Sequence, residues 1–136
     1  MAKAERPKKP LKPPSPARVA AFRAGVDAEA RCADLLRGQG FAIVATRYKT
    51  RYGEIDLIAR RASTIAFVEV KARRRLADAA FAVTPRQQRR VIDAAQAWLA
   101  DHPDADGCDL RFDVMLVGRS GAPQHLVAAF DATPEF

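Results

Sequence analysis

Two short runs in the middle of the chain alternate apolar and polar residues at every second position. The first covers residues 53–59 and reads GEIDLIA, and the second covers residues 65–71 and reads IAFVEVK. A period of two is typical of β-strands that bury one face. The intervening residues 60–64 are mostly polar and predict a turn. The two runs should therefore pair as a β-hairpin centred between Ala62 and Ser63.

Closing this hairpin brings four charged residues together. Positions whose numbers sum to 125 then face each other, so Asp56 lies opposite Glu69 and Glu54 lies opposite Lys71. Residues two apart in a strand share a face, which predicts one polar square on one side of the hairpin. Two carboxylates about 5 Å apart repel by roughly 3 kcal/mol at an effective dielectric constant of about 20. The pattern therefore predicts a small hard cation, Mg²⁺ or Mn²⁺, between Asp56 and Glu69.

A solvated strand pair gives a simpler explanation of the same residues. Acids and lysines often face each other on exposed strands, where water screens their charges. Ile58, Ile65 and Phe67 weaken this explanation, because the alternation puts them on the face of the charged residues. That face is therefore expected to be at least partly buried.

A first helix is predicted over residues 19–37, because apolar residues recur there at helical spacing and glycines follow at 38 and 40. At about 100° per residue, Glu29 falls in the middle of the apolar stripe. The stripe consists of Phe22, Val26, Cys32, Ala33 and Leu36. A lone buried charge is costly, so Glu29 either pairs with an arginine or points toward the charged residues of the hairpin.

The other elements complete an α/β pattern. Residues 41–45 read as a first strand, and residues 109–117 and 125–129 as a fourth and fifth. Thr84 and Pro85 are favourable N-cap and first residues for a helix that runs to about residue 100, with Gln88 extending its apolar face. The order α-β-β-β-α-β predicts a mixed sheet flanked by helices, in a three-layer arrangement.

Composition and charge are those of one soluble domain with a basic tail. The chain has 136 residues, 49% hydrophobic and 29% charged, and a net charge of +7. Residues 1–18 contain six bases, one acid and five of the nine prolines, so we expect an extended, disordered tail followed by a single domain over residues 19–136. The tail either aids solubility or attracts polyanions.

The location predicted from the sequence is the cytoplasm. No apolar run approaches the roughly 20 residues of a membrane span, and residues 1–18 lack the apolar core of a signal peptide. Cys32 and Cys108 lack metal-ligand spacing, and His102 and His125 stand far apart in the sequence. A disulfide framework, a zinc site and histidine-based catalysis are therefore not expected.

Basic residues surround the predicted hairpin, and a nucleic-acid backbone is their expected partner. They precede its first strand, follow its second strand and continue on the second helix. The set is Arg47, Lys49, Arg51, Arg73, Arg74, Arg86 and Arg89. An ordinary charged rim explains any single one of them equally well.

The motif Asp56 followed by Glu69-Val70-Lys71, with Glu29 on a preceding helix, resembles the PD-(D/E)xK nuclease superfamily. The segments GEIDLIA, FVEVKAR, RFDV and AAFDA are also similar to the bacterial YraN family of uncharacterised, predicted endonucleases. This resemblance covers about residues 22–132. It departs from the superfamily at Ile55, where a proline is loosely kept.

The resemblance implies a restriction-endonuclease-like core and a role for each motif residue. Asp56 and Glu69 would bind the catalytic Mg²⁺ or Mn²⁺, with the Val70 carbonyl as third ligand. Lys71 would position the attacking water or stabilise the phosphate, and Glu29 would complete the metal site or its surroundings. Two further residues, Glu54 and Gln88, are expected to support the site.

The expected function is metal-dependent hydrolysis of phosphodiester bonds in nucleic acid, with structured or branched DNA as the leading substrate. The alternative is a nucleic-acid-binding or adaptor protein that keeps the fold without cutting. A purely structural partner of another protein is a third hypothesis. Junction-cutting enzymes usually need two sites, so a homodimer is included among the expected partners, although no segment of the sequence identifies its surface.

Overall fold

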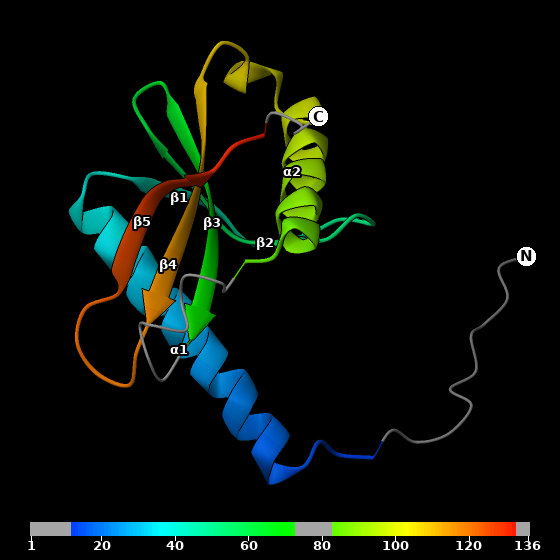
Figure 1. Cartoon of the computed structure of the whole chain (residues 1–136), viewed down its shortest axis with the longest axis vertical. Coiled ribbons are helices and arrows are strands. Elements are labelled where there is room, and N and C mark those ends of the chain that lie inside the picture. The colour runs from blue at the N-terminus through cyan, green and yellow to red at the C-terminus, as the bar shows by residue number, and fades with distance from the viewer. Residues whose placement is uncertain (1–11, 73–82, 133–136) are drawn as a thin grey trace, which may run out of the picture.

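The computed structural model describes residues 12–72 and 83–132, and they form a mixed α/β fold (Figure 1). The elements are α1 (Pro16–Gly38), β1 (Ala42–Lys49), β2 (Glu54–Arg61), β3 (Thr64–Ala72), α2 (Pro85–Ala100), a 3₁₀ turn η2 (Pro103–Ala105), β4 (Asp109–Val117) and β5 (Gln124–Phe130). The predicted order, including the fifth strand, is confirmed. None of the helices in these two ranges has the length and apolar character that crossing a membrane requires.

The five strands form one sheet in the order β1-β2-β3-β4-β5. Strands β3 and β4 run parallel, and the chain between them contains α2, as the sequence predicted. All other neighbouring strands are antiparallel. The sheet is therefore mixed, and the order and layers match a restriction-endonuclease-like core.

Each face of the sheet is covered by a different helix, which gives three layers (Figure 1). Side chains of α1 pack with Leu57, Val68 and Met115 on one face. Side chains of α2 pack with Ile58 and Phe67 on the other face. Neighbouring residues of one strand therefore contribute to opposite cores, as the alternation of a β-strand requires.

Both helices begin at side-chain caps. The Ser15 hydroxyl accepts a hydrogen bond from the Arg18 amide, so α1 begins at Pro16 rather than at the predicted residue 19. Thr84 caps α2 through reciprocal hydrogen bonds with Gln87, as its sequence predicted. Strand β1 is longer than expected, because residues 46–49 continue it beyond residue 45.

The first half of α1 extends beyond the ends of the strands (Figure 1), which corrects part of the predicted buried stripe. Phe22 is 63% exposed and Val26 is 37% exposed. The buried residues of α1 all come from its second half, and they are Ala28, Cys32, Ala33 and Leu36. The helix is longer than the sheet, so a correctly aligned stripe is only half covered.

Candidate functional site

The β2–β3 hairpin has the predicted register, and its ladder ends just before the charged residues. Paired positions run from Arg61–Thr64 to Leu57–Val68, each pair summing to 125. One step further, the backbone N–H of Val70 donates a hydrogen bond of 2.8 Å to the Asp56 carboxylate. A side chain of β2 thus replaces the backbone of β2 as the partner of β3.

The side chains of strand β2 do not alternate regularly between the two faces of the sheet at this point. This corrects the predicted flat square of four charged residues. Ile55 packs with the α2 cluster, whereas Leu57, two residues later, packs with the α1 cluster. On the neighbouring strand, Arg47 has a left-handed backbone with a φ of 49°. Regular alternation therefore fails on both strands, and in β2 it fails between Ile55 and Leu57.

The charged residues nevertheless remain close enough to act on one another. Burial raises the pKa of Asp56 to about 6; the Val70 amide opposes this rise, and Glu29 and Glu54 add to it. Burial also raises the pKa of Glu69 to about 8, with Asp56 as the next cause and Lys71 opposing it. The charge of Asp56 therefore acts on Glu69 in a partly buried setting.

Glu69 is the least satisfied member of this cluster. Glu69 is only 8% exposed, and its Oε1 atom is buried without a hydrogen-bond partner. Buried polar atoms are normally paired, so an orphaned carboxylate oxygen beside a second acid calls for a cation. The donor set of Asp56 and Glu69 fits Mg²⁺ or Mn²⁺, which binds one or two protein carboxylates and completes its shell with other oxygens.

The third predicted acid, Glu29, forms an ion pair with an arginine. Its Oε2 atom lies 2.8 Å from Nε of Arg47, so α1 and β1 are joined by an ion pair. This hydrogen bond is the largest cause that raises the pKa of Arg47, and Glu54 and Asp56 act in the same direction. Both predictions for Glu29 therefore hold in part: it pairs with an arginine, and it lies close enough to affect Asp56. Within residues 12–72 and 83–132, no three acids, histidines or cysteines are grouped to hold a metal.

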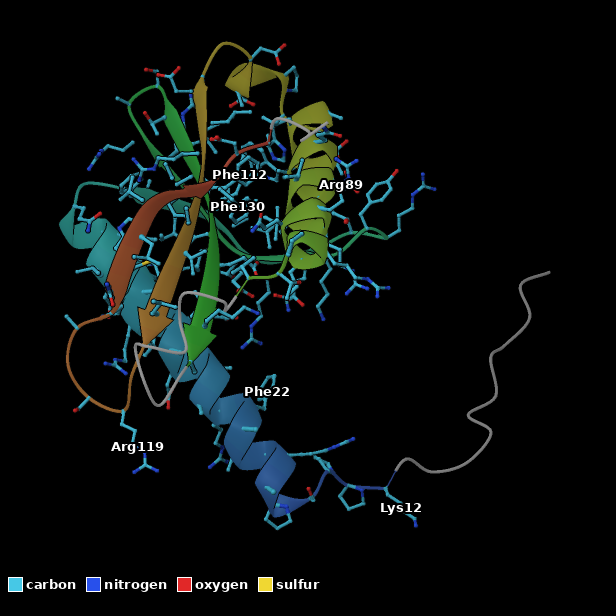
Figure 2. All side chains as sticks on the ribbon, in the orientation of Figure 1. Lys12, Phe22, Arg89, Phe112, Arg119 and Phe130 are labelled. Carbon is cyan, nitrogen blue, oxygen red and sulfur yellow. The ribbon has the colours of Figure 1, made fainter. Side chains whose placement is uncertain are left out.

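The predicted basic residues have different surroundings. Lys49 in β1 lies opposite Glu54 in β2 in the register of the two strands. Arg51, in the following turn, donates to the Tyr52 hydroxyl and lies 4.9 Å from the centre of that ring. Arg86 and Arg89 are exposed on α2 (Figure 2 labels Arg89). The remaining two, Arg73 and Arg74, lie outside the described residues.

The β1–β2 turn lies against α2. A Cβ added to Gly53 would come within 3.1 Å of the Arg90 Cβ, closer than almost all real contacts. Gly53 therefore lets the turn that carries Arg51 approach the basic first half of α2. The predicted supporting residue Gln88 donates to the Val83 carbonyl at the start of α2, which is a helix-end contact.

One polar network was missed by the sequence analysis. Asp113, in β4, has 0% exposure and accepts hydrogen bonds from Arg111 and from the Ala128 amide, and its Oδ2 lies 2.7 Å from Nε2 of His125. Ala128 has a left-handed φ of 52°, beside the shift in register between β4 and β5. The segment RFDV contained a usable signal, because an acid in a buried strand needs partners and Arg111 shares its face.

Comparison with known proteins places the chain in one family. Residues 28–117 match the uncharacterised protein family UPF0102. A UPF0102 protein of Bradyrhizobium sp. strain ORS 278 is 62% identical over 126 residues, covering 93% of this chain and 89% of the relative. Another, of Bradyrhizobium sp. strain BTAi1, is 58% identical over 135 residues, covering 98% and 99%. A third, of Rhodopseudomonas palustris strain BisB18, is 61% identical over 120 residues, covering 88% and 89%. The chain belongs to the UPF0102 family.

Proposed function

We propose that this UPF0102 protein is a metal-dependent nuclease that hydrolyses phosphodiester bonds in DNA. The observation that carries the proposal is the buried, unpaired Oε1 of Glu69 beside the carboxylate of Asp56. A buried acid beside a half-buried acid is costly when both are ionised, and a bound cation relieves this cost at a pH where the proton has left. The likeness of the motif Asp56…Glu69-Val70-Lys71 to the PD-(D/E)xK superfamily and to the YraN family gives the same answer independently.

The residues of the cluster have distinct roles in this proposal. Asp56 and Glu69 hold Mg²⁺ or Mn²⁺, and the Val70 carbonyl is the third protein ligand. The bound ion supplies an activated water and charge stabilisation at the phosphate. The Val70 amide keeps the Asp56 carboxylate aimed at the gap between β2 and β3. The positive charge of Lys71 lowers the pKa of both acids. This supports a role for its ammonium group in stabilising the charge that develops on the phosphate.

DNA is the proposed substrate because basic residues lie on the β1–β2 turn, next to Glu54, and on the part of α2 that contacts this turn. Lys49 and Arg51 lie at the β1–β2 turn, and Arg86 and Arg89 lie on α2, which contacts that turn at Arg90. Lysine and arginine bind phosphates through charge, with an affinity that falls as salt rises. Branched or otherwise structured DNA is the form that we propose to test first. Cutting both strands of a junction needs two sites, so a homodimer is the expected working form.

The experiment is a cleavage assay on single-stranded, duplex and branched DNA with Mg²⁺ or Mn²⁺. Cleavage should disappear with EDTA and in Asp56→Asn and Glu69→Gln, which keep the side-chain size. Lys71→Met should also abolish it. Asp34→Asn, on the exposed face of α1, is the matched control and should cut normally. Activity that survives in Asp56→Asn would show that the ion site lies elsewhere.

A non-catalytic DNA-binding or adaptor protein is the alternative function. The ion pair between Glu29 and Arg47 favours it, because this pair occupies the acid that would complete a three-carboxylate site. This alternative predicts salt-sensitive DNA binding without cutting of any substrate by the wild-type protein. It also predicts that Asp56→Asn leaves DNA affinity unchanged in the presence and absence of metal.

A further inference from the structure

We propose that Arg47 couples metal binding to DNA binding. In the structure Arg47 is held by Glu29, and metal binding beside Asp56 and Glu69 would release it to contact a backbone phosphate. This inference rests on the proposed function and adds to it a positioning residue and an order of events. The conformational change it requires is a rotation of one side chain.

The geometry of Arg47 is unusual for a residue that only covers a strand. Its backbone is left-handed, a conformation that costs energy for a residue other than glycine. That conformation interrupts the regular alternation of β1, and the guanidinium reaches Glu29 on α1 over 2.8 Å. The same guanidinium lies 5.0 Å from the centre of the Phe22 ring, on the exposed half of the helix (Figure 2). Arg47 is thus held in place by α1 at a surface that DNA can reach.

The charges around Arg47 explain why a metal would release it. Arg47 lies near Glu54 and Asp56 as well as Glu29, so it supplies positive charge to the acids that face the proposed ion. Its side chain is 33% exposed and that of Glu29 is 19% exposed, so water reaches the pair and screens it in part. A divalent ion would attract Glu29 and repel Arg47 at the same time. The guanidinium would then need a new anion, and a DNA phosphate is the bidentate partner that arginine prefers.

Coupling of this kind must act in both directions. If metal increases the affinity for DNA, then DNA increases the affinity for metal by the same factor. Arg51 provides a comparison within the same chain, because its described partner is Tyr52 and no acid of the cluster. A phosphate contact by Arg51 should therefore contribute equally with and without metal.

The first experiment measures DNA affinity by fluorescence anisotropy in Ca²⁺ and in EDTA at matched ionic strength, because Ca²⁺ binds carboxylate oxygens but has a different coordination geometry from Mg²⁺. The wild-type protein should bind DNA about tenfold more tightly in Ca²⁺, a typical size for coupling between two sites. Arg47→Ala should lose this increase, whereas Arg51→Ala should weaken binding equally in both conditions. Glu29→Gln should bind tightly in EDTA, because its Arg47 is already free.

The second experiment uses Mn²⁺ alone, with no DNA and no cleavage. Arg47 and Mn²⁺ compete for Glu29 in this proposal, so Arg47→Ala should bind Mn²⁺ at least about threefold more tightly by calorimetry. Arg51→Ala should bind Mn²⁺ like the wild type. Arg47→Lys keeps the charge with a smaller head group, and it shows whether any effect of Arg47→Ala is a folding defect.

The outcomes separate this inference from the proposed function. A wild-type protein that neither binds nor cuts DNA overturns the proposed function. A wild-type protein that cuts DNA, with the Ca²⁺-dependent increase preserved in Arg47→Ala, overturns only the coupling. Weaker Mn²⁺ binding in a folded Arg47→Ala protein would also overturn it, because Arg47 would then support the ion site rather than compete with it.

Discussion

The Val70 backbone N–H donates a hydrogen bond to the Asp56 carboxylate at the point where the β2–β3 ladder ends. This bond favours the charged form of Asp56, whereas burial favours the neutral form. The strand therefore holds an anion in a place where an anion alone is costly. Glu69 directly precedes Val70 in β3, and its Oε1 atom is buried in the same region without a hydrogen-bond partner. In the proposed function these two acids, on neighbouring strands, hold the cation.

We expect the metal-free protein to lose stability as pH rises from about 4.5 to about 8. Burial, followed by Asp56, raises the pKa of Glu69 from 4.5 to about 8. Between these values the folded protein keeps a proton that the unfolded chain has released, so stability falls by up to about 1.4 kcal/mol per pH unit. Below this window Glu69 is protonated in both the folded and the unfolded protein, and above it Glu69 is ionised in both. The stability therefore depends on the ionisation of Glu69 only within the window. Asp56 adds a loss of the same sign between 3.8 and about 6. Urea denaturation in EDTA at several pH values measures it.

Glu69→Gln isolates the contribution of this one group. The variant cannot ionise there, so its stability should change less than that of the wild type between about pH 6 and about pH 8. It should also be the more stable protein at the upper end of that range. Asp34→Asn, on the exposed face of α1, is the control and should keep the wild-type slope. Equal slopes for Glu69→Gln and the wild type would mean that Glu69 ionises normally in the folded protein.

Mg²⁺ or Mn²⁺ should stabilise the protein, and more strongly at pH 8 than at pH 6. Metal ions bind carboxylates only after the proton has left, so the ion competes with the raised pKa values of Asp56 and Glu69. An ion at about 100 times its Kd adds about 2.7 kcal/mol to the unfolding free energy. Thermal melts with and without EDTA measure the difference. Asp56→Asn should remove the gain and Asp34→Asn should keep it; a gain of equal size in both variants would point to nonspecific ion binding.

The fold and the hairpin register could be predicted because local patterns determine them. The turn between Ala62 and Ser63 fixes which residues pair, and a slip by one residue would turn Phe67 out of its core. Alternation could not predict where pairing stops. At Asp56 a side chain competes with the backbone for the Val70 amide, and at Arg47 the backbone is left-handed. Both depend on tertiary contacts, which a period of two does not describe.

The helical period alone could not predict which residues of α1 are buried, because their burial depends on where the sheet ends. The helical period correctly aligned Phe22, Cys32 and Leu36 on one stripe, but it contains no information on where the strands end. The network around Asp113 was missed for a related reason. His125 comes from a neighbouring strand, and a shift in register between β4 and β5 brings the Ala128 amide to Asp113.

Phe22→Ser should change the unfolding free energy by less than about 1 kcal/mol, because the ring is 63% exposed. Phe67→Ala should cost roughly 3–5 kcal/mol, because the ring is fully buried between Trp98 and Phe112. Urea denaturation of both variants provides the comparison. A large loss in Phe22→Ser would show that the first half of α1 is covered in solution, and a concentration-dependent loss would identify a second copy as the cover.

Asp113→Asn should destabilise the protein by roughly 3–5 kcal/mol, because it removes the charge that balances a partly buried Arg111. Asp109→Asn changes an exposed acid at the start of the same strand and should stay within about 0.5 kcal/mol of the wild type. Urea denaturation measures both.

Amide hydrogen exchange adds a local test of the same residue. The Ala128 N–H donates to Asp113, so its protection should fall in Asp113→Ala, which has no side-chain acceptor, more than that of the Met115 amide in the centre of β4. Loss of protection at Ala128 alone, with global stability unchanged, would mean that Asp113 only anchors the bulge in β5. Full protection at Ala128 would mean that the left-handed backbone at this residue holds β5 without the carboxylate.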